Sequence, residues 1–254
     1  MPNIFYGVNT SFDLISNTHG RNRLKFVESF EVDATLNNKR LRFFNTKEAL
    51  AISIFEGVQG SFGFLETEEK LFLASVMDQN PALNVINDDP ASYQPFCALL
   101  NSRNERGTQS QGVFVKSMRI QGTPESLAPL EEQHERCGFI AATRFKIKGG
   151  GIAYFRILAA VPAVGVFTTP DDINFDATGL AVLPTTIPFA VNILDALTTR
   201  RWLAAFKNGS DMTQSAIDDP SIFDVTSTVT GGEIQLPAAP AATDVWEFYI
   251  PYKV

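Results

Sequence analysis

The sequence has few of the residues that carry metal chemistry or covalent cross-links. Its 254 residues include two cysteines, Cys97 and Cys137, and two histidines, His19 and His134. Two cysteines do not form a disulfide framework, although one bond between them stays open. His134 and Cys137 lie three residues apart, but a structural zinc site normally needs four nitrogen or sulfur ligands. We therefore expect no metal site and no cofactor.

The sequence also lacks the motifs of common hydrolases and nucleotide-binding proteins. It contains no G-x-S-x-G, no H-E-x-x-H and no Walker A sequence. The acids in SDMTQSAIDD and DDPSIFD lack the alternating oxygens, glycine turn and terminal glutamate of a calcium loop. We therefore expect no catalytic residues and a protein that is not an enzyme. Distant carboxylates that meet in the fold and hydrolyse a sugar remain an alternative.

Long apolar runs and the pattern of a signal peptide are not found either. No run of 18 or more apolar residues is present, so we expect no membrane span. The first residues, MPNIFYGVNTSFD, lack the basic region and apolar run of a signal peptide, so the expected setting is a cytoplasm.

The sequence also has fewer basic than acidic residues. The formal net charge is -7, which repels nucleic acid at long range and disfavours a DNA-binding domain. Basic residues gather in the first fifth of the chain, and acidic residues dominate from Asp171 onward. This asymmetry favours contact between the basic edge of one subunit and the acidic edge of another, with an ordinary solvated surface as the alternative.

What the sequence has in abundance is the pattern of β-strands. Phenylalanine, which is favoured in strands and cores, occurs 21 times. Alternating or strand-like segments occur at residues 24–34, 111–122 and 244–254. The segment RFKIKGGGIAYFRI, residues 144–157, predicts a hairpin whose turn is the run of three glycines at 149–151.

Helix signals are fewer. Thr67 is a good N-cap, two glutamates follow it and Pro81 ends the pattern, so we predict a helix at residues 67–80. Weaker helical signals lie at residues 125–136 and 188–209. A strand remains the alternative for part of the last segment.

The stretch ISIFEGVQGSFGFL, residues 52–65, has its glycines spaced G-x-x-G-x-x-G. A dinucleotide loop needs G-x-G-x-x-G, so we do not expect a phosphate site here. Read with a period of two, the segment is a half-buried strand. Its apolar face carries Ile52, Ile54, Val58, Phe62 and Phe64. The opposite face, called the small-polar face below, carries Ser53, Gly57, Gln59, Ser61 and Gly63.

This strand, followed at once by a short helix, resembles the core of bacteriophage tail tube proteins, also called major tail proteins. The paired strands KFVESFEVDATLNNKRLRFF precede it and a long polar loop follows, so the resemblance covers about residues 20–120. It implies a mainly β fold, a tail-tube-like β-barrel or sandwich with one or two short helices over residues 1–125. Residues 126–254 would add further β-rich elements, as part of the same domain, as a second tube-like unit or as an insertion.

The resemblance implies a structural virion protein of the tail, assembled in the host cytoplasm. Its subunits would form rings, commonly hexameric, that stack into a tube through which DNA passes during genome ejection without specific binding. Its partners would be further copies of itself and sheath, baseplate or tail terminator proteins, and the small-polar face would be a candidate for the lumen side. The alternatives are a capsid decoration or baseplate protein, or a carbohydrate-binding or hydrolytic β protein.

The charged segment around residue 149 supplies candidates for contacts between subunits. From their charge and the predicted hairpin, we expect four basic residues to pair with acids of a neighbouring subunit: Arg144, Lys146, Lys148 and Arg156.

Overall fold

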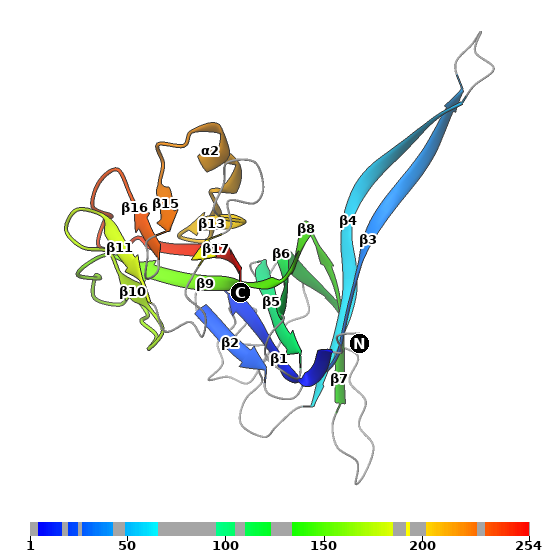
Figure 1. Cartoon of the computed structure of the whole chain (residues 1–254), viewed down its shortest axis with the longest axis horizontal. Helices are drawn as coiled ribbons and strands as arrows, with labels where there is room; N and C mark the ends of the chain where they lie inside the picture. The colour runs from blue at the N-terminus through cyan, green and yellow to red at the C-terminus, as the bar shows by residue number, and fades with distance from the viewer. Residues whose placement is uncertain are drawn as a thin grey trace.

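The computed structural model describes residues 5–16, 20–24, 27–42, 49–65, 95–104, 110–122, 134–184, 192–193, 202–227 and 232–253. These residues form three sheets, which confirms the predicted mainly β fold class (Figure 1). Within the described residues, each sheet stays open and none closes into a barrel.

The first sheet contains eight antiparallel strands in the order β2-β1-β5-β6-β7-β4-β3, with β8 paired to β6. Its strands are β1 Phe5–Ser16, β2 Gly20–Leu24, β3 Val27–Arg42, β4 Ala49–Leu65, β5 Phe96–Asn104, β6 Ser110–Gly122, β7 His134–Ala141 and β8 Thr143–Lys148. The sheet therefore continues beyond residue 125, where the sequence suggested a boundary, as far as Lys148.

The first sheet curls around an apolar core. Phe12 of β1 lies 5.0 Å from Phe30 of β3, measured between ring centroids, although these strands lie near opposite ends of the sheet. Val58 and Phe62 of the predicted apolar face are buried in this core. The strand interpretation of residues 52–65 is therefore confirmed.

Strands β3 and β4 extend beyond the rest of the first sheet (Figure 1). β4 pairs with β7 only from Val58 to Leu65, whereas its pairing with β3 continues to the pair Arg42 and Ala49. We call the two-stranded extension, residues 35–42 and 49–57, the projecting arm. An isolated two-stranded ribbon is marginally stable in water, so an arm of this length favours a further packing partner.

The second sheet contains six strands in the order β10-β9-β17-β13-β14, with β12 paired to β17. Its strands are β9 Gly150–Leu158, β10 Ile173–Asn174, β12 Asn192–Ile193, β13 Ala204–Lys207, β14 Ser210–Asp211 and β17 Val245–Lys253. The third sheet has the order β11-β16-β15 and consists of β11 Leu180–Leu183, β15 Asp224–Ser227 and β16 Gly232–Gln235.

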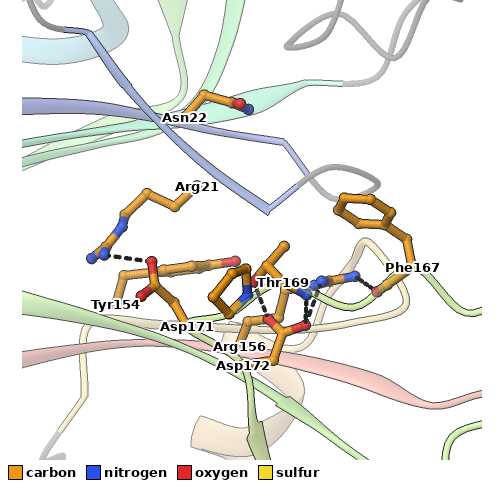
Figure 2. Close-up of a pocket in the computed structure, with 9 residues that line it drawn as sticks. Arg21, Asn22, Tyr154, Arg156, Phe167, Thr169, Asp171 and Asp172 are labelled. Atoms are coloured by element: carbon orange, nitrogen blue, oxygen red, sulfur yellow. Dashed lines mark hydrogen bonds and ion pairs between the residues drawn. The ribbon is translucent and has the colours of Figure 1, made fainter.

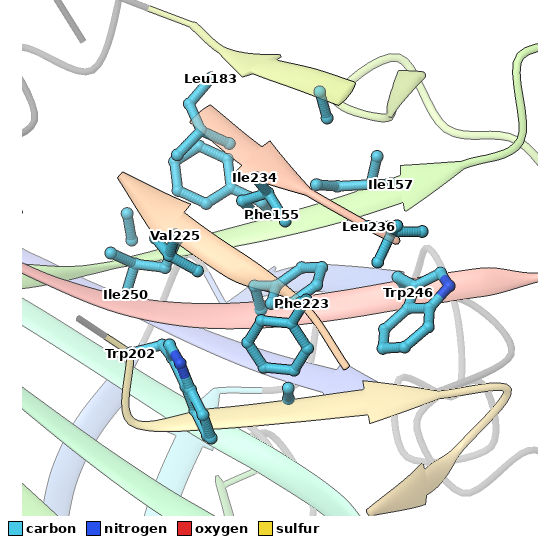
Figure 3. Close-up of a cluster of buried hydrophobic side chains, with 14 of the residues drawn as sticks. Phe155, Ile157, Leu183, Trp202, Phe223, Val225, Ile234, Leu236, Trp246 and Ile250 are labelled. Carbon is cyan, nitrogen blue, oxygen red and sulfur yellow. The ribbon is translucent and has the colours of Figure 1, made fainter. Parts of the chain in front are cut away.

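The second sheet is the middle layer, because both of its faces are buried. Alternate residues of β9 and β17, such as Phe155 and Ile250, enter a core shared with the third sheet (Figure 3). On the opposite face, Ile152 and Tyr249 pack against Phe114 of the first sheet. The rings of Phe114 and Tyr249 stack with their centroids 4.2 Å apart.

Polar contacts also join the first two sheets. The Asn101 side chain donates to the Ile152 carbonyl at 2.9 Å and accepts from the Ile152 N–H at 3.0 Å. Lys116 of β6 pairs with Asp211 of β14 at 2.6 Å and donates to Thr213 at 3.0 Å. These contacts satisfy polar groups at the interface and hold the sheets in one relative position.

The predicted hairpin at residues 144–157 is wrong, although both of its strands exist. β8 pairs with β6 of the first sheet, whereas β9 pairs with β17 and β10 of the second. Gly149, with φ of +74°, lies where the chain passes from one sheet to the other. Strand alternation does not reveal the partner strand, and this crossing satisfies the Gly149 N–H through the Ser110 carbonyl.

The helical signals have different outcomes. The predicted helix at residues 67–80 lies outside the described residues. The first weaker signal ends in strand His134–Ala141, so a helix over residues 134–136 is wrong. In the second, Asn192–Ile193 and Ala204–Lys207 are strands, which confirms the strand alternative for part of that segment. The helix that the structure does describe, α2 at Thr213–Asp218, falls in the segment SDMTQSAIDD, where the sequence analysis predicts no helix.

Candidate functional site

A pocket lies where β2 of the first sheet faces β9 and loop 159–172 of the second (Figure 2). Its volume is about 250 Å³. It is lined by Arg21, Asn22, Tyr154, Arg156, Phe167, Thr169, Pro170, Asp171 and Asp172. We call it the β2 pocket, and its residues come from parts of the chain more than 100 residues apart.

The floor of the β2 pocket is a buried ion pair. The Arg156 Nη1 atom lies 2.9 Å from Asp172 Oδ2, and both side chains are about 95% buried, with relative exposures of 4% and 5%. Arg156 also donates from Nη2 to the Phe167 carbonyl at 3.0 Å. A buried pair is tolerated when additional hydrogen bonds satisfy its remaining atoms. Removing either partner would leave an uncompensated charge.

Asp172 is held in place by the loop that carries it. Its Oδ2 accepts the Thr169 N–H at 2.6 Å, and its Oδ1 accepts the Thr169 hydroxyl at 2.7 Å. An acid that binds the backbone three residues earlier stabilises a tight turn. Asp172 therefore anchors the loop to Arg156 on β9.

A second polar pair lies beside this floor. Tyr154 of β9 donates its hydroxyl to Glu247 Oε1 of β17 at 2.6 Å. Glu247 is buried and stands opposite Arg156 in the strand register. Burial, followed by the neighbouring Glu247 charge and hydrogen bond, raises the pKa of Tyr154 well above its ordinary value. The phenol therefore stays protonated and acts as a donor to Glu247.

One side of the pocket is formed by an ion pair between the first two sheets. Arg21 of β2 lies 2.8 Å from Asp171, whose side chain is 71% exposed. An exposed pair of this kind contributes at most about 1 kcal/mol to stability. Its main consequence is geometric, because it places β2 against loop 159–172.

Two N–H donors of residues that line the β2 pocket have no hydrogen-bond partner. They are Arg156 Nε and Asn22 Nδ2, and both atoms are fully buried. In the strand register Asn22 stands opposite Leu14, which lies in the core of the first sheet, and Figure 2 shows its side chain on the side of β2 away from the Arg156–Asp172 pair. Buried donors in proteins are normally satisfied, so these two atoms are exceptions.

The sequence prediction did not find this pocket. Arg156 was named as a residue that pairs with a neighbouring subunit, but the structure places it in a buried pair within its own chain. A signal for burial was present, because Arg156 is a single charge inside the apolar run IAYFRILAA. The contribution of Arg21 and Asn22 needs the tertiary structure, since β2 lies far away in the sequence.

The other three basic candidates lie on β8. Lys146 and Lys148 are exposed, and Arg144 is partly buried and donates to the Val32 carbonyl of β3. Among the described strands, β6 is the one that pairs with β8. Their contact with a neighbouring subunit stays a prediction.

The small-polar face lies on the side of β4 opposite the buried Val58 and Phe62. Gln59 is exposed, Ser61 and Gly57 are half-buried and Gly63 is buried, while the Ser53 side chain lies outside the described set. In the strand register, Ser61 and Gln59 stand opposite Glu31 and Asp33 of β3, both exposed. This part of the first sheet is therefore polar and acidic.

The two cysteines are free and buried, so the structure does not pair them. Burial, the largest effect, raises the pKa of the Cys97 thiol to about 12, which makes it unreactive at neutral pH. Among the described residues, no cluster of three or more His, Cys, Asp or Glu is arranged to hold a metal ion. None of the described helices is long and apolar enough to cross a membrane.

No family model and no curated protein matches this sequence. Among solved structures, the chain is similar to the tube-terminating cap of the anti-feeding prophage, at 10% identity and a TM-score of 0.43, over 58% of this chain and 93% of that one. It is similar to a chain of the sheath-tube complex of the PVC extracellular contractile injection system, at 9% identity and a TM-score of 0.43, over 57% and 92%.

A third likeness spans nearly the whole chain. It is to the Dit protein of phage SPP1, described as part of a hub adsorption apparatus, at 8% identity and a TM-score of 0.27, over 95% of this chain and 99% of that one.

Proposed function

We propose that this protein is a structural, non-enzymatic component of a phage tail or a tail-like injection particle, and that it assembles with copies of itself. The observation that carries the proposal is the projecting arm on an open sheet. A two-stranded arm and unpaired sheet edges gain stability by pairing with another chain. The sequence resemblance to tail tube proteins supports the same proposal.

The finer proposal is a tube subunit. Its rings would stack, and the small-polar face beside Glu31 and Asp33 would line the lumen. Acidic side chains repel DNA phosphates, so DNA would pass without being held. Sheath, terminator or baseplate proteins would bind the ends and the outside of such a tube.

A baseplate ring component is the second candidate, and one observation favours it. The second sheet packs on one face of the first sheet through the cluster around Tyr249, and it carries the third sheet on its other face. These two sheets form an additional unit beside the first sheet. In a protein that joins different parts of a particle, such a unit would supply a second binding surface. The two candidates differ in the assembly that we expect. A tube subunit would form long hollow tubes, whereas a baseplate component would form single closed rings.

The test is to shorten the projecting arm. Residues 37–54 are replaced by Asn-Gly, a dipeptide that connects paired strands in a two-residue turn, so that Leu36 and Phe55 flank the new turn. The variant keeps Val58 to Leu65, the part of β4 that pairs with β7, so we expect it to fold. Negative-stain electron microscopy and light scattering of the purified chain then compare assembly before and after the change.

We expect rings or tubes from the original chain and monomers from the shortened one. A shortened chain that assembles as well as the original would contradict the role of the arm. An original chain that stays monomeric at high concentration would contradict self-assembly as a whole.

A further inference from the structure

The projecting arm has two different faces. In the strand register Lys39 stands opposite Ile52, and residues that stand opposite each other share a face. Leu41 stands opposite Leu50 on the same face, because it lies two residues after Lys39. This face, called the Lys39 face below, combines one positive charge with apolar residues. A two-stranded ribbon gains stability when such a face packs on another layer.

The third sheet has one face in a core and one face toward solvent. Ala181, Val225 and Ile234 enter the core that is shared with the second sheet. The residues that alternate with them form the outer face: Leu180, Val182, Asp224, Thr226, Glu233 and Gln235. Val182 is 62% exposed, and Asp224 is exposed as well. The outer face therefore places the apolar strand β11 beside two strands that each carry one acid.

The arm and the third sheet carry opposite charge. The arm, residues 35–42 and 49–57, contains three basic residues and one acid. The strands of the third sheet contain two acids, Asp224 and Glu233, and no basic residue. Complementary charges steer two surfaces together and fix their orientation, while apolar side chains supply the buried contact.

These two surfaces do not meet within one chain. Figure 1 shows β3 and β4 extending from the first sheet on the side away from β11, β15 and β16. The second sheet lies between the first sheet and the third. A contact between the surfaces therefore has to form between two copies, each of which offers both of them. Such a head-to-tail contact repeats from copy to copy and generates a ring or an open filament.

We propose that the arm of one copy packs its Lys39 face on the outer face of the third sheet of the next copy. Lys39 then lies beside Asp224 and Glu233 of that copy, while Leu41 and Ile52 cover its Val182. The two layers pack face to face, as in a β-sandwich. This inference rests on the proposed self-assembly, and it names the surface that receives the arm.

The first experiment changes the apolar part of the receiving face in the full chain. Val182→Asp places a charge where the arm packs, and Val164→Asp makes the same change at a fully exposed valine outside the third sheet. Light scattering and negative-stain microscopy measure the protein concentration at which assemblies form. We expect Val182→Asp to raise this concentration at least about tenfold and Val164→Asp to change it less than about twofold.

The second experiment exchanges charges across the contact. Lys39→Glu changes the net charge from -7 to -9 and places acid against acid, so assembly should weaken at least about tenfold. Adding Asp224→Lys returns the net charge to -7 and restores an attraction, so assembly should improve about fivefold or more over Lys39→Glu alone.

A matched control separates this exchange from total charge. Lys39→Glu combined with Val161→Lys and Val164→Lys also has a net charge of -7, but it keeps Asp224. Both valines are exposed and lie outside the third sheet. This control should assemble as weakly as Lys39→Glu alone. Thermal unfolding checks that each variant is folded, and the charge exchange decides alone if Val182→Asp does not fold.

Three results would overturn the inference while the original chain still assembles. They are normal assembly of a folded Val182→Asp variant, no recovery in the charge exchange, and equal recovery in its matched control. Each would exclude the third sheet as the surface that receives the arm and leave the proposed self-assembly intact. An original chain that stays monomeric would contradict the proposed function and, with it, this inference.

Discussion

At Gly60, side chains and backbone of the two neighbouring strands leave no space for a side chain. It lies on the buried face of β4, opposite Phe139 of β7 in the strand register. A Cβ atom at this position would lie 2.5 Å from the Phe139 ring and would also clash with the Glu31 carbonyl. In the sequence Gly60 only interrupts the apolar face, whereas in the fold it leaves the space that the aromatic ring fills.

We predict that Gly60→Ala destabilises the protein and that Gly138→Ala does not. Overpacking a core costs about 1–3 kcal/mol of the free energy of unfolding. A Cβ at Gly138 on the adjacent strand would meet no atom within 4 Å. There the change should be neutral or stabilising by up to about 1 kcal/mol. Urea denaturation measures both variants, and equal effects would contradict this explanation.

At the level of elements, the apolar run FCALL in β5 shows why some strands lack alternation. Phe96 and Ala98 enter the core inside the curled first sheet, whereas Cys97 and Leu99 face the second sheet. Both faces are buried, so both must be apolar. Strands with one exposed face, such as β8, alternate clearly and were predicted from the sequence.

Strand β8 carries the prediction for subunit contacts. Lys146→Glu combined with Lys148→Glu should impair assembly, because the exposed lysines would no longer attract acids of a neighbour. Negative-stain microscopy measures the number and length of the assemblies. Tubes or rings of normal number and length would contradict the prediction.

Net charge alone could produce the same result, so a matched pair separates the two causes. Lys146→Gln with Lys148→Gln changes the net charge from -7 to -9, and so does Ala239→Glu with Thr243→Glu on an exposed loop far from β8 in the sequence. We expect weaker assembly from the first pair and near-normal assembly from the second. If both pairs weaken assembly equally, the cause is the total net charge and not the lysines of β8.

At the level of the whole molecule, the second sheet joins the other two by both of its faces. The first interface contains the Phe114–Tyr249 stack and the two hydrogen bonds of Asn101, and the second contains both tryptophans. Large shared interfaces couple the stability of the parts they join. The protein should therefore unfold as one unit, although its strands form three sheets.

We predict that Asn101→Ala weakens this coupling. It leaves the N–H and the carbonyl of Ile152 without their partner, at a cost of about 1–3 kcal/mol. Tryptophan fluorescence reports on Trp202 and Trp246, while far-UV circular dichroism reports on all strands. In urea, the two transitions should coincide for the original chain and separate for the variant.

Asn174→Ala is the control for this experiment. Its side chain also donates two hydrogen bonds to the backbone, to the carbonyls of Ala159 and Ala160. Unlike Asn101, it does not bridge the first and second sheets, because these bonds join β10 to the residues that follow β9. Its transitions should stay coincident. Coincident transitions and an unchanged midpoint for Asn101→Ala would show that this residue does not couple the sheets.

The sequence by itself determined the mainly β class and the two faces of residues 52–65. These follow from local alternation, because successive side chains of a strand point to opposite sides. Tertiary structure decided which strands pair, that β8 and β9 enter different sheets, and that Arg156 is buried with Asp172. It also built the β2 pocket from Arg21 and Arg156. The physical reason is that pairing and burial depend on contacts between distant segments, which alternation along one segment does not specify.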